Sequence, residues 1–207
     1  MRGEDVREVV HVHISGFPGF FLSFLGPAFL YQLYRVIVTD VTGIGFVYEC
    51  DGYIQGFVAG TAEASGFYSR VLCRKWWRFA AASVGAAIRQ PTVILRLLRA
   101  LGKPGEYRSG ESTASLMSIA VVPKVRRNSI GTRLVETFLA EAERRGVERV
   151  SLTTDRRGND GVNAFYRRLG FVCHHSFTTP EGREMNEYVL ELPMLRRPSR
   201  VEGCKDA

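Results

Sequence analysis

Cysteine is scarce in this sequence, and no two cysteines stand close enough to form a recognisable pair. No histidine has the spacing to another histidine or to a cysteine that is typical of a metal site. We therefore expect reduced thiols in a cytoplasmic protein, with no disulfide framework and no bound metal. The four thiols belong to Cys50, Cys73, Cys173 and Cys204.

Long uninterrupted apolar runs are also lacking, although residues 9–34 contain no Asp, Glu, Lys or Arg. A helix that spans a membrane needs about 20 mainly apolar residues in succession. Pro18 and the pair Gly26-Pro27 interrupt this run, which favours two short buried helices and no transmembrane span. Acidic residues such as Glu4 stand where a signal peptide would carry basic ones, so no signal peptide is expected.

Acidic side chains are almost missing from one segment, whereas basic ones are abundant in it. The 207-residue chain has a net charge of +7. Residues 66–108 hold nine basic residues and one acidic residue, so they account for +8 and the rest of the chain for about −1. Two amphipathic helices separated at Gln90-Pro91, with solvated basic faces, are the favoured interpretation. A lid over a binding site, an arm of a homodimer, and a surface for lipid or nucleic acid are the alternatives, of which a nucleic-acid partner is least expected.

Hydrophobic periodicity predicts a single α/β domain over residues 1–207, with a basic helical insert at 66–110 and a mobile polar tail at 196–207. Asp51-Gly52 is a strong hairpin signal between two β-rich runs. The uncharged run at 112–122 is typical of a strand that is buried on both faces. Helices are predicted at about 5–15, 27–39, 131–145 and 160–169, and strands at 46–50, 53–62, 112–122, 149–154, 171–178 and 187–192.

The sequence RRNSIG, residues 126–131, forms a basic turn between a predicted strand and a predicted helix. Free backbone N–H groups and the positive end of a helix face an anion in such an arrangement. Gly131 permits close approach of the backbone to a ligand, and Arg126 and Arg127 add charge. Taken alone, the pattern fits a phosphate cradle and a solvated surface turn equally well.

A second motif, NDGVNAFYRRLGF at 159–171, follows the next predicted strand. Together with IAVVPKVRRNSIGTRL at 119–134, it resembles the cofactor motifs of the GNAT superfamily of acetyl-CoA-dependent N-acetyltransferases. Those motifs read V-x-P-x-x-R/Q-x-x-G-x-G/A and N-x-x-x-x-x-F-Y-x-x-x-G-F, and the resemblance covers about residues 112–192. It implies a mixed, mostly antiparallel central sheet flanked by helices, with the insert between the third and fourth strands. It also implies acetyl-CoA as cosubstrate and direct attack by the amine of a small molecule or peptide.

The resemblance further implies a role for each matching residue. Ile119 and Val121 would offer backbone groups to the pantetheine arm, and Asn159 would bond the same arm. Tyr166 would lie near the sulfur and protonate the departing thiolate, because a phenol pKa of about 10 roughly matches a thiol pKa of about 8.5. A packed helix aromatic is the alternative for Tyr166. The implied cofactor-binding residues are Ile119, Ala120, Val121, Arg126, Arg127, Asn128, Ser129, Ile130, Gly131, Thr132 and Asn159.

The chain departs from the family pattern at two places. Ser129 occupies the position of the family's first glycine, which a serine can fill if its φ angle is negative. The N-terminus enters a helix almost at once, so the first strand of the family is predicted to be reduced or absent.

The general base is not assigned by any motif. Some relatives carry a Glu five residues before the Asn of the second motif, but Thr154 stands at this position. Asp155 is favoured as a cap or turn residue, and Glu111 is remote, because eight residues of strand put it about 26 Å from Ile119. His13 lies on the first helix, near where relatives place the acceptor, although a lone helix His is more often packed or on the surface. Proton removal through water is the remaining route.

Two other functions stay open at this stage. One is a noncatalytic acyl-CoA-binding module, and the other is a peripheral protein that binds anionic surfaces through the basic insert. If the chain is an acetyltransferase, its acceptor is expected to enter between the first two helices and the insert. That entrance is aromatic and cationic, which favours an acceptor with an anionic or sugar-like part over a polyamine.

Overall fold

The computed structural model describes residues 1–67, 79, 112–125 and 129–193. Of the basic insert it describes only Gly66, Phe67 and Phe79. The predicted helices of the insert, the predicted cradle residues Arg126, Arg127 and Asn128, and the predicted mobile tail lie outside the described residues.

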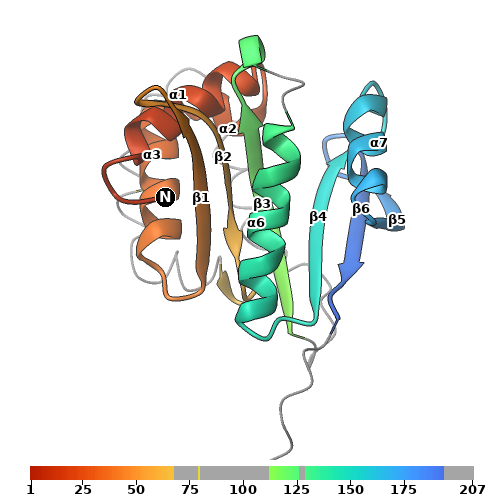
Figure 1. The fold of residues 1–207 in the computed structure, drawn as a ribbon. Helices are drawn as coiled ribbons and strands as arrows, with labels where there is room; N and C mark the ends of the chain where they lie inside the picture. The colour runs from red at the N-terminus through yellow and green to blue at the C-terminus, as the bar shows by residue number, and fades with distance from the viewer. Residues whose placement is uncertain (68–78, 80–111, 126–128, 194–207) are drawn as a thin grey trace, which may run out of the picture.

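The described residues form helices and strands in the order that Figure 1 shows. The helical elements are α1 (Val6–Gly16), α2 (Phe21–Phe24), α3 (Pro27–Thr39), the 3-10 turn η1 (Pro123–Val125), α6 (Ile130–Arg144) and α7 (Asp160–Arg168). The strands are β1 (Gly43–Cys50), β2 (Tyr53–Thr61), β3 (Thr113–Val121), β4 (Arg149–Asp155), β5 (Val172–Thr178) and β6 (Glu184–Glu191). The last strand begins three residues earlier than the sequence predicts, and α2 is not predicted at all.

The strands form one sheet in the order β1-β2-β3-β4-β6-β5. Every neighbouring pair is antiparallel except β3 and β4, which are parallel. This arrangement confirms the predicted mixed, mostly antiparallel sheet. The insert, however, separates β2 from β3, which are the second and third strands in the described structure. It was expected between the third and fourth, and the count differs because the described N-terminus contains no strand before α1.

A helix is the first element of the described N-terminus, where the family pattern has a strand. Asp5 precedes α1 without a side-chain cap, and a turn brings the Asp5 N–H to the Arg2 carbonyl at 3.2 Å. The nitrogen of Met1 donates to the carbonyl of Gly45 on β1 at 3.0 Å. One hydrogen bond from Met1 to the edge strand β1 is thus found in place of a paired first strand, which the sequence predicts to be reduced or absent.

Two apolar clusters cover the opposite faces of the sheet. One packs α1 and α3 against β2, with Leu30, Ile37 and Phe57 fully buried. The other packs α6 and α7 against β3 and β4, with Val135 and Phe138 fully buried. Burying a side chain of this size contributes about 1.5–3 kcal/mol. The sheet is thus covered on both faces, which explains the uncharged sequence of β3.

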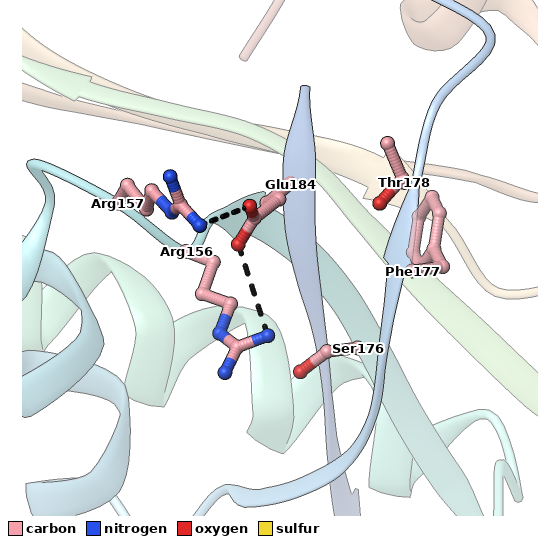
Figure 2. Close-up of a pocket in the computed structure, with 6 residues that line it drawn as sticks. All are labelled: Arg156, Arg157, Ser176, Phe177, Thr178 and Glu184. Atoms are coloured by element: carbon pink, nitrogen blue, oxygen red, sulfur yellow. Dashed lines mark ion pairs between the residues drawn. The ribbon is translucent and has the colours of Figure 1, made fainter. Parts of the chain in front are cut away.

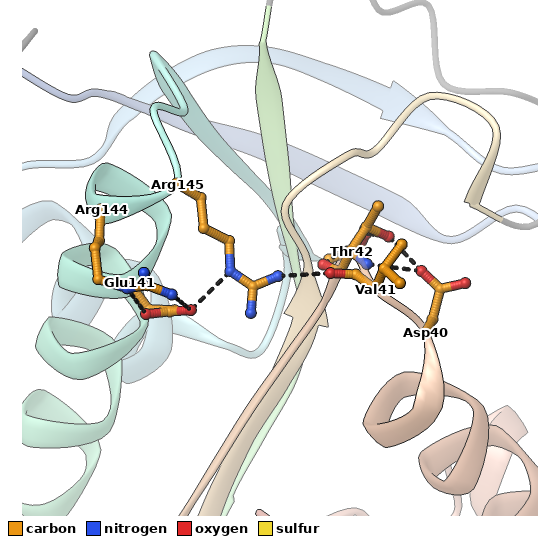
Figure 3. Close-up of polar contacts among 7 residues, drawn as sticks. Asp40, Val41, Thr42, Glu141, Arg144 and Arg145 are labelled. Carbon is orange, nitrogen blue, oxygen red and sulfur yellow. Dashed lines mark hydrogen bonds and ion pairs between the residues drawn. The ribbon is translucent and has the colours of Figure 1, made fainter. Parts of the chain in front are cut away.

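Arg145 joins the end of α6 to the turn between α3 and β1 (Figure 3). Its Nε donates to Glu141 Oε1 at 2.7 Å and its Nη1 to the Val41 carbonyl at 3.1 Å. Arg144 donates to the same carboxylate, and these hydrogen bonds, first that of Arg144, lower the pKa of Glu141 to about 2. The Asp40 carboxylate holds the turn itself through the N–H of Thr42 at 2.9 Å. The C-terminal end of α6 is therefore tied to the turn that leads into β1.

No helix in the described part of the chain is both long and apolar enough to cross a membrane. The uncharged run at 9–34 instead forms α1, α2 and most of α3, with Gly26 and Pro27 at the start of α3. Cys50 and Cys173 are free thiols, while Cys73 and Cys204 fall outside the described residues.

Candidate active site

β3 and β4 separate after a short paired stretch, as Figure 1 shows. Only Thr113 to Ser115 pair with Arg149 to Ser151. Beyond that point β4 continues to pair with β6 as far as Asp155, and β3 continues to pair with β2 as far as Val121. Two strand edges therefore face each other across a gap without a ladder between them in the described structure. Their N–H and C=O groups are available to a third chain-like ligand.

A bulge in β3 decides which residues face the gap. Gly60 pairs with Leu116 and Ala59 pairs with Ser118, so Met117 is the extra residue. After the bulge, the N–H of Val122 donates to the carbonyl of Gln55 on β2 at 2.8 Å. Backbone groups of successive residues point to opposite edges of a strand, so Ile119 and Val121 direct theirs away from β2. These two residues face the gap, and Ala120 between them faces β2.

The start of α6 has no side-chain cap. Ser129 occupies the N-cap position with φ 57° and ψ 9°, a left-handed conformation, and it makes no side-chain hydrogen bond there. Its carbonyl accepts the N–H of Arg133 at 3.0 Å. The N–H groups of Ile130, Gly131 and Thr132 precede that first intrahelical bond, so they lack an intrahelical partner. The condition under which a serine fits the glycine position, a negative φ, is not met, and Ser129 holds the conformation that glycine favours.

We expect Ser129→Gly to stabilise the protein. A residue with a Cβ pays about 1 kcal/mol to hold the left-handed conformation, whereas glycine does not. The free energy of unfolding in urea should therefore rise by about 1 kcal/mol, less the extra chain entropy that glycine loses on folding. Ser129→Val is the matched control, because a β-branched side chain tolerates this conformation least. A Val variant as stable as the Gly variant would contradict the strained turn.

The side chain of Asn159 lies at the end of β4. Its Nδ2 donates to Thr154 Oγ1 at 2.7 Å, and its Oδ1 has no hydrogen-bond partner among the described residues. One turn along α7, the buried Asn163 donates to the carbonyls of Asp155 and Asn159 at 3.0 and 2.8 Å. The amide oxygen of Asn163 accepts from Tyr188 at 3.0 Å. Asn163 therefore fixes the start of α7 against β4 and β6, and leaves one acceptor of Asn159 open.

Tyr166 is buried on α7, with 5% of its surface exposed. Its ring meets those of Phe171 and Tyr188 at centroid distances of 5.7 and 6.1 Å. The hydroxyl has no hydrogen-bond partner among the described residues. Burial raises the pKa of Tyr166 above its ordinary value. The phenol thus stays protonated at neutral pH, although its pKa lies further from that of a thiol than the sequence argument assumed.

The first turn of α6 contacts α7. A Cβ built on Gly131 would lie 3.5 Å from the ring of Phe165, the residue before Tyr166. Ile119, Val121 and Tyr166 belong to the same apolar cluster. In the described part of the structure, the start of α6 thus contacts α7, and the predicted pantetheine edge and the predicted acid pack into one cluster. The structure describes only Ser129 to Thr132 of the predicted pyrophosphate turn.

Asp155, one of the two acidic candidates for the base, is engaged in an ion pair in the described structure. The carboxylate of Asp155 accepts from two nitrogens of the Arg183 guanidinium, Nε at 3.2 Å from Oδ1 and Nη2 at 2.8 Å from Oδ1 and 2.7 Å from Oδ2. Asp155 is thus a paired residue at the end of β4, and its carboxylate holds Arg183 where the sequence favoured a cap or turn role. Thr154 is engaged by Asn159, and Glu111 lies outside the described residues.

His13 is buried in a polar cluster that joins α1, α3 and β3. Its Nδ1 lies 2.6 Å from the Tyr34 hydroxyl, which donates to Ser118 Oγ at 3.0 Å. Its Nε2 is a buried atom without a partner among the described residues. Burial among the rings of Phe17, Tyr34 and Phe57 lowers the pKa of His13 to about 4. The imidazole is therefore neutral at pH 7 and is a packed residue, the alternative that the sequence favours.

A separate open hollow lies at the far edge of the sheet (Figure 2). Glu184 lies between two arginines there, with its Oε1 2.6 Å from Arg157 Nη2 and its Oε2 3.8 Å from Arg156 Nη1. The hollow is lined by Arg156, Arg157, Ser176, Phe177, Thr178 and Glu184, none of which the sequence motifs select. We place the site at the gap, because its open backbone groups match the motif residues and the ion-paired hollow contains none of them.

Sequence reasoning missed the residues that support the site from a distance. Tyr34 and Ser118 are 84 residues apart in the chain, and no local spacing indicates their contact. Arg183 lies in the turn before β6, 28 residues from its partner Asp155. Asn163 carried one usable signal, since it follows Asn159 by four residues and so lies on the same face of α7.

The sequence and the fold were compared with those of known proteins. Residues 20–171, well over half of the chain, match the family described as "Acetyltransferase (GNAT) family". The [ribosomal protein bS18]-alanine N-acetyltransferase of Escherichia coli K12 is 34% identical over 85 residues, which are 39% of this chain and 56% of that protein. The match thus spans about half the length of this curated relative.

Solved structures share the fold at low sequence identity. The ribosomal-protein-S18-alanine N-acetyltransferase from Escherichia coli superposes with a TM-score of 0.56 at 17% identity, over 94% of this chain and 92% of that one. An aminoglycoside 6′-N-acetyltransferase solved in complex with coenzyme A gives a TM-score of 0.56 at 15% identity, over 92% and 91% of the two chains. These likenesses establish a common architecture.

Proposed function

The chain belongs to the GNAT acetyltransferase family, and on this premise we propose that it transfers an acetyl group from acetyl-CoA to an amine. The observation that carries the proposal is the gap between β3 and β4, into which Ile119 and Val121 direct their backbone groups. A pantetheine arm has alternating amide donors and acceptors, so it can pair with this edge as an added strand would.

The start of α6 suits the pyrophosphate of the same cosubstrate. The N–H groups of Ile130, Gly131 and Thr132 precede the first intrahelical bond, and they lie at the positive end of a 15-residue helix. Gly131 has no side chain to cover these N–H groups. In the sequence, Arg126 and Arg127 precede the turn and add positive charge. We assign the free Oδ1 of Asn159 to an amide N–H of the pantetheine arm, with Thr154 holding the Asn159 side chain in place.

Bound acetyl-CoA supplies the thioester carbonyl carbon that the neutral amine attacks. An N–H on the open edge of β3 would donate to the carbonyl oxygen as negative charge develops on it. Tyr166 would donate its proton to the departing thiolate, since its hydroxyl is protonated and otherwise without a partner in the described structure. We assign proton removal from the amine to water, because Asp155 is ion-paired and His13 is buried and weakly basic.

The acceptor is proposed to be an amine on a small molecule or a peptide. The curated relative acts on an alanine of ribosomal protein bS18, as its name states, so a peptide that begins with alanine is one candidate. The sequence expects the acceptor to enter between the first two helices and the basic insert, whose nine basic residues outnumber its one acidic residue. On that charge we propose an acceptor with an anionic or sugar-like part over a polyamine.

The proposal is tested by incubating the full chain with acetyl-CoA and a panel of amines, and by measuring thiol release together with product mass. The panel contains a peptide with N-terminal alanine, glucosamine 6-phosphate and spermidine. We expect thiol release that depends on one of the first two and a product heavier by one acetyl group. Spermidine as the best acceptor would contradict the charge argument. Binding of acetyl-CoA without release for any amine would favour a noncatalytic acyl-CoA-binding module.

A further inference from the structure

Three potential metal ligands meet at the outer edge of the sheet, away from the motif residues. His174 and His175 lie on the edge strand β5, and Glu187 lies on β6. The two Nδ1 atoms are 3.2 Å apart, and Glu187 Oε2 lies 2.9 Å from Nδ1 of His175 and 3.9 Å from Nδ1 of His174. Each residue thus offers one ligand atom to a common point.

A bulge in β5 makes this convergence possible. Cys173 pairs with Tyr188 and His175 pairs with Glu187, which leaves His174 as an extra residue. In a regular strand, two consecutive side chains point to opposite faces of the sheet. The bulge interrupts that alternation, so both imidazoles lie on the face where Glu187 lies. This is why the adjacent histidines carry no metal signal in the sequence.

The cluster lies on the sheet face opposite α7. The neighbours of Glu187 on β6 are Asn186 and Tyr188, and both bond to Oδ1 of Asn163 on α7 at 3.0 Å. Because side chains alternate along a strand, Glu187 points to the other face. The cluster is therefore separate from Tyr166 and from the open edge of β3, and an ion bound there would leave the proposed acetyl-transfer residues untouched.

The spacing of the three ligand atoms fits a tetrahedral ion. Ligands at 2.0–2.1 Å from zinc in tetrahedral geometry lie about 3.3 Å from one another. The three observed separations, 3.2, 2.9 and 3.9 Å, lie around that value. Without an ion, the two Nδ1 atoms and the carboxylate can share only the protons on those two nitrogens. Two imidazoles and one carboxylate are a ligand set that zinc accepts, whereas Ca²⁺ and Mg²⁺ prefer oxygen ligands alone.

We propose that His174, His175 and Glu187 bind a zinc ion, with water in the fourth position. The side chains of the two histidines are 65% and 51% exposed, so the fourth position faces solvent, while that of Glu187 is 18% exposed and packed between the strands. Such a site has three protein ligands and one open position. Zinc bound there clips the edge strand β5 to β6, whose pairing the bulge interrupts.

The test is isothermal titration of the full chain with zinc chloride, with magnesium chloride as the control metal. We expect one zinc ion per chain and no heat from magnesium. His175→Ala and Glu187→Gln should each weaken zinc binding at least tenfold. His11→Ala is the matched control, because His11 is an exposed histidine on α1, and it should bind zinc as the unchanged chain does.

A second measurement keeps the proposal testable if a variant unfolds. Cobalt added to the unchanged chain should give the visible absorption of a four-coordinate ion, and one equivalent of zinc should abolish it. The proposal is overturned if the unchanged chain takes up neither metal. It is also overturned if His175→Ala and Glu187→Gln, both folded by circular dichroism, bind zinc as tightly as the unchanged chain. Neither result depends on acetyl transfer.

Discussion

Tyr166→Phe is expected to lower kcat by about 10²-fold and to leave acetyl-CoA binding and folding nearly unchanged. The substitution removes only the hydroxyl, which has no partner among the described residues, and keeps the ring packed on Phe171 and Tyr188. A positioned general acid contributes about 10²–10⁴-fold to a rate. Steady-state kinetics with the best amine of the panel, together with acetyl-CoA titration, provide the measurement.

The matched control for this substitution is Tyr53→Phe. Tyr53 is 73% exposed at the start of β2, so loss of its hydroxyl should leave kcat unchanged. Because burial raises the pKa of Tyr166, the kcat of the unchanged enzyme should show no loss of the acid form near pH 10. If Tyr166→Phe kept more than half of the original kcat, the acid role would be refuted and Tyr166 would be a packing residue.

Acid is expected to destabilise the protein through His13. In the unfolded chain this imidazole takes up a proton below its ordinary pKa of 6.5, whereas in the fold its pKa is about 4. The unfolded state therefore binds more protons between these values, and stability falls as the pH is lowered from about 6.5 to about 4. The shift corresponds to a loss of about 3 kcal/mol at pH 4, measured as the free energy of unfolding in urea.

The comparison of His13→Leu with His11→Leu isolates this contribution. His13→Leu has no proton to bind, so its stability should fall by about 3 kcal/mol less over the same pH range. His11 lies two residues away on α1 and is exposed, so its replacement should keep the full pH dependence. The low pKa of Glu141 acts in a lower window, from about 4.5 to 2, and affects all three proteins equally. Identical pH profiles for the two variants would rule out a buried neutral His13.

Local sequence signals predicted much of the fold. Asp51 and Gly52 have φ angles of 54° and 75°, which the hairpin turn requires and which this dipeptide supplies. Pro27 begins α3, and Gly146 follows α6 with a φ of 74°. Each of these signals acts within a few residues, because it reflects the conformational preference of a single side chain or of its absence.

The parts that were not predicted depend on contacts between distant segments or on bulges. The bulge at Met117 fixes which backbone groups of β3 face the gap, and the bulge at His174 brings two histidines to one face. Neither position carries a Gly or Pro that would mark it. The positive φ of Ser129 was not predicted, because the turn into α6 overrides the local preference of a serine. The motif residues were identified by resemblance, and the structure adds their spatial relation.

Amide NMR of the ¹⁵N-labelled chain during titration with acetyl-CoA tests the central claim most directly. Our account predicts that the largest shifts occur at Ile119 and Val121, whose N–H groups face the gap, and at Gly131 and Thr132 at the start of α6. Ala120, which faces β2, should shift less than either neighbour. Saturable shifts confined to the hollow around Arg157, or no shifts at millimolar acetyl-CoA, would contradict the account.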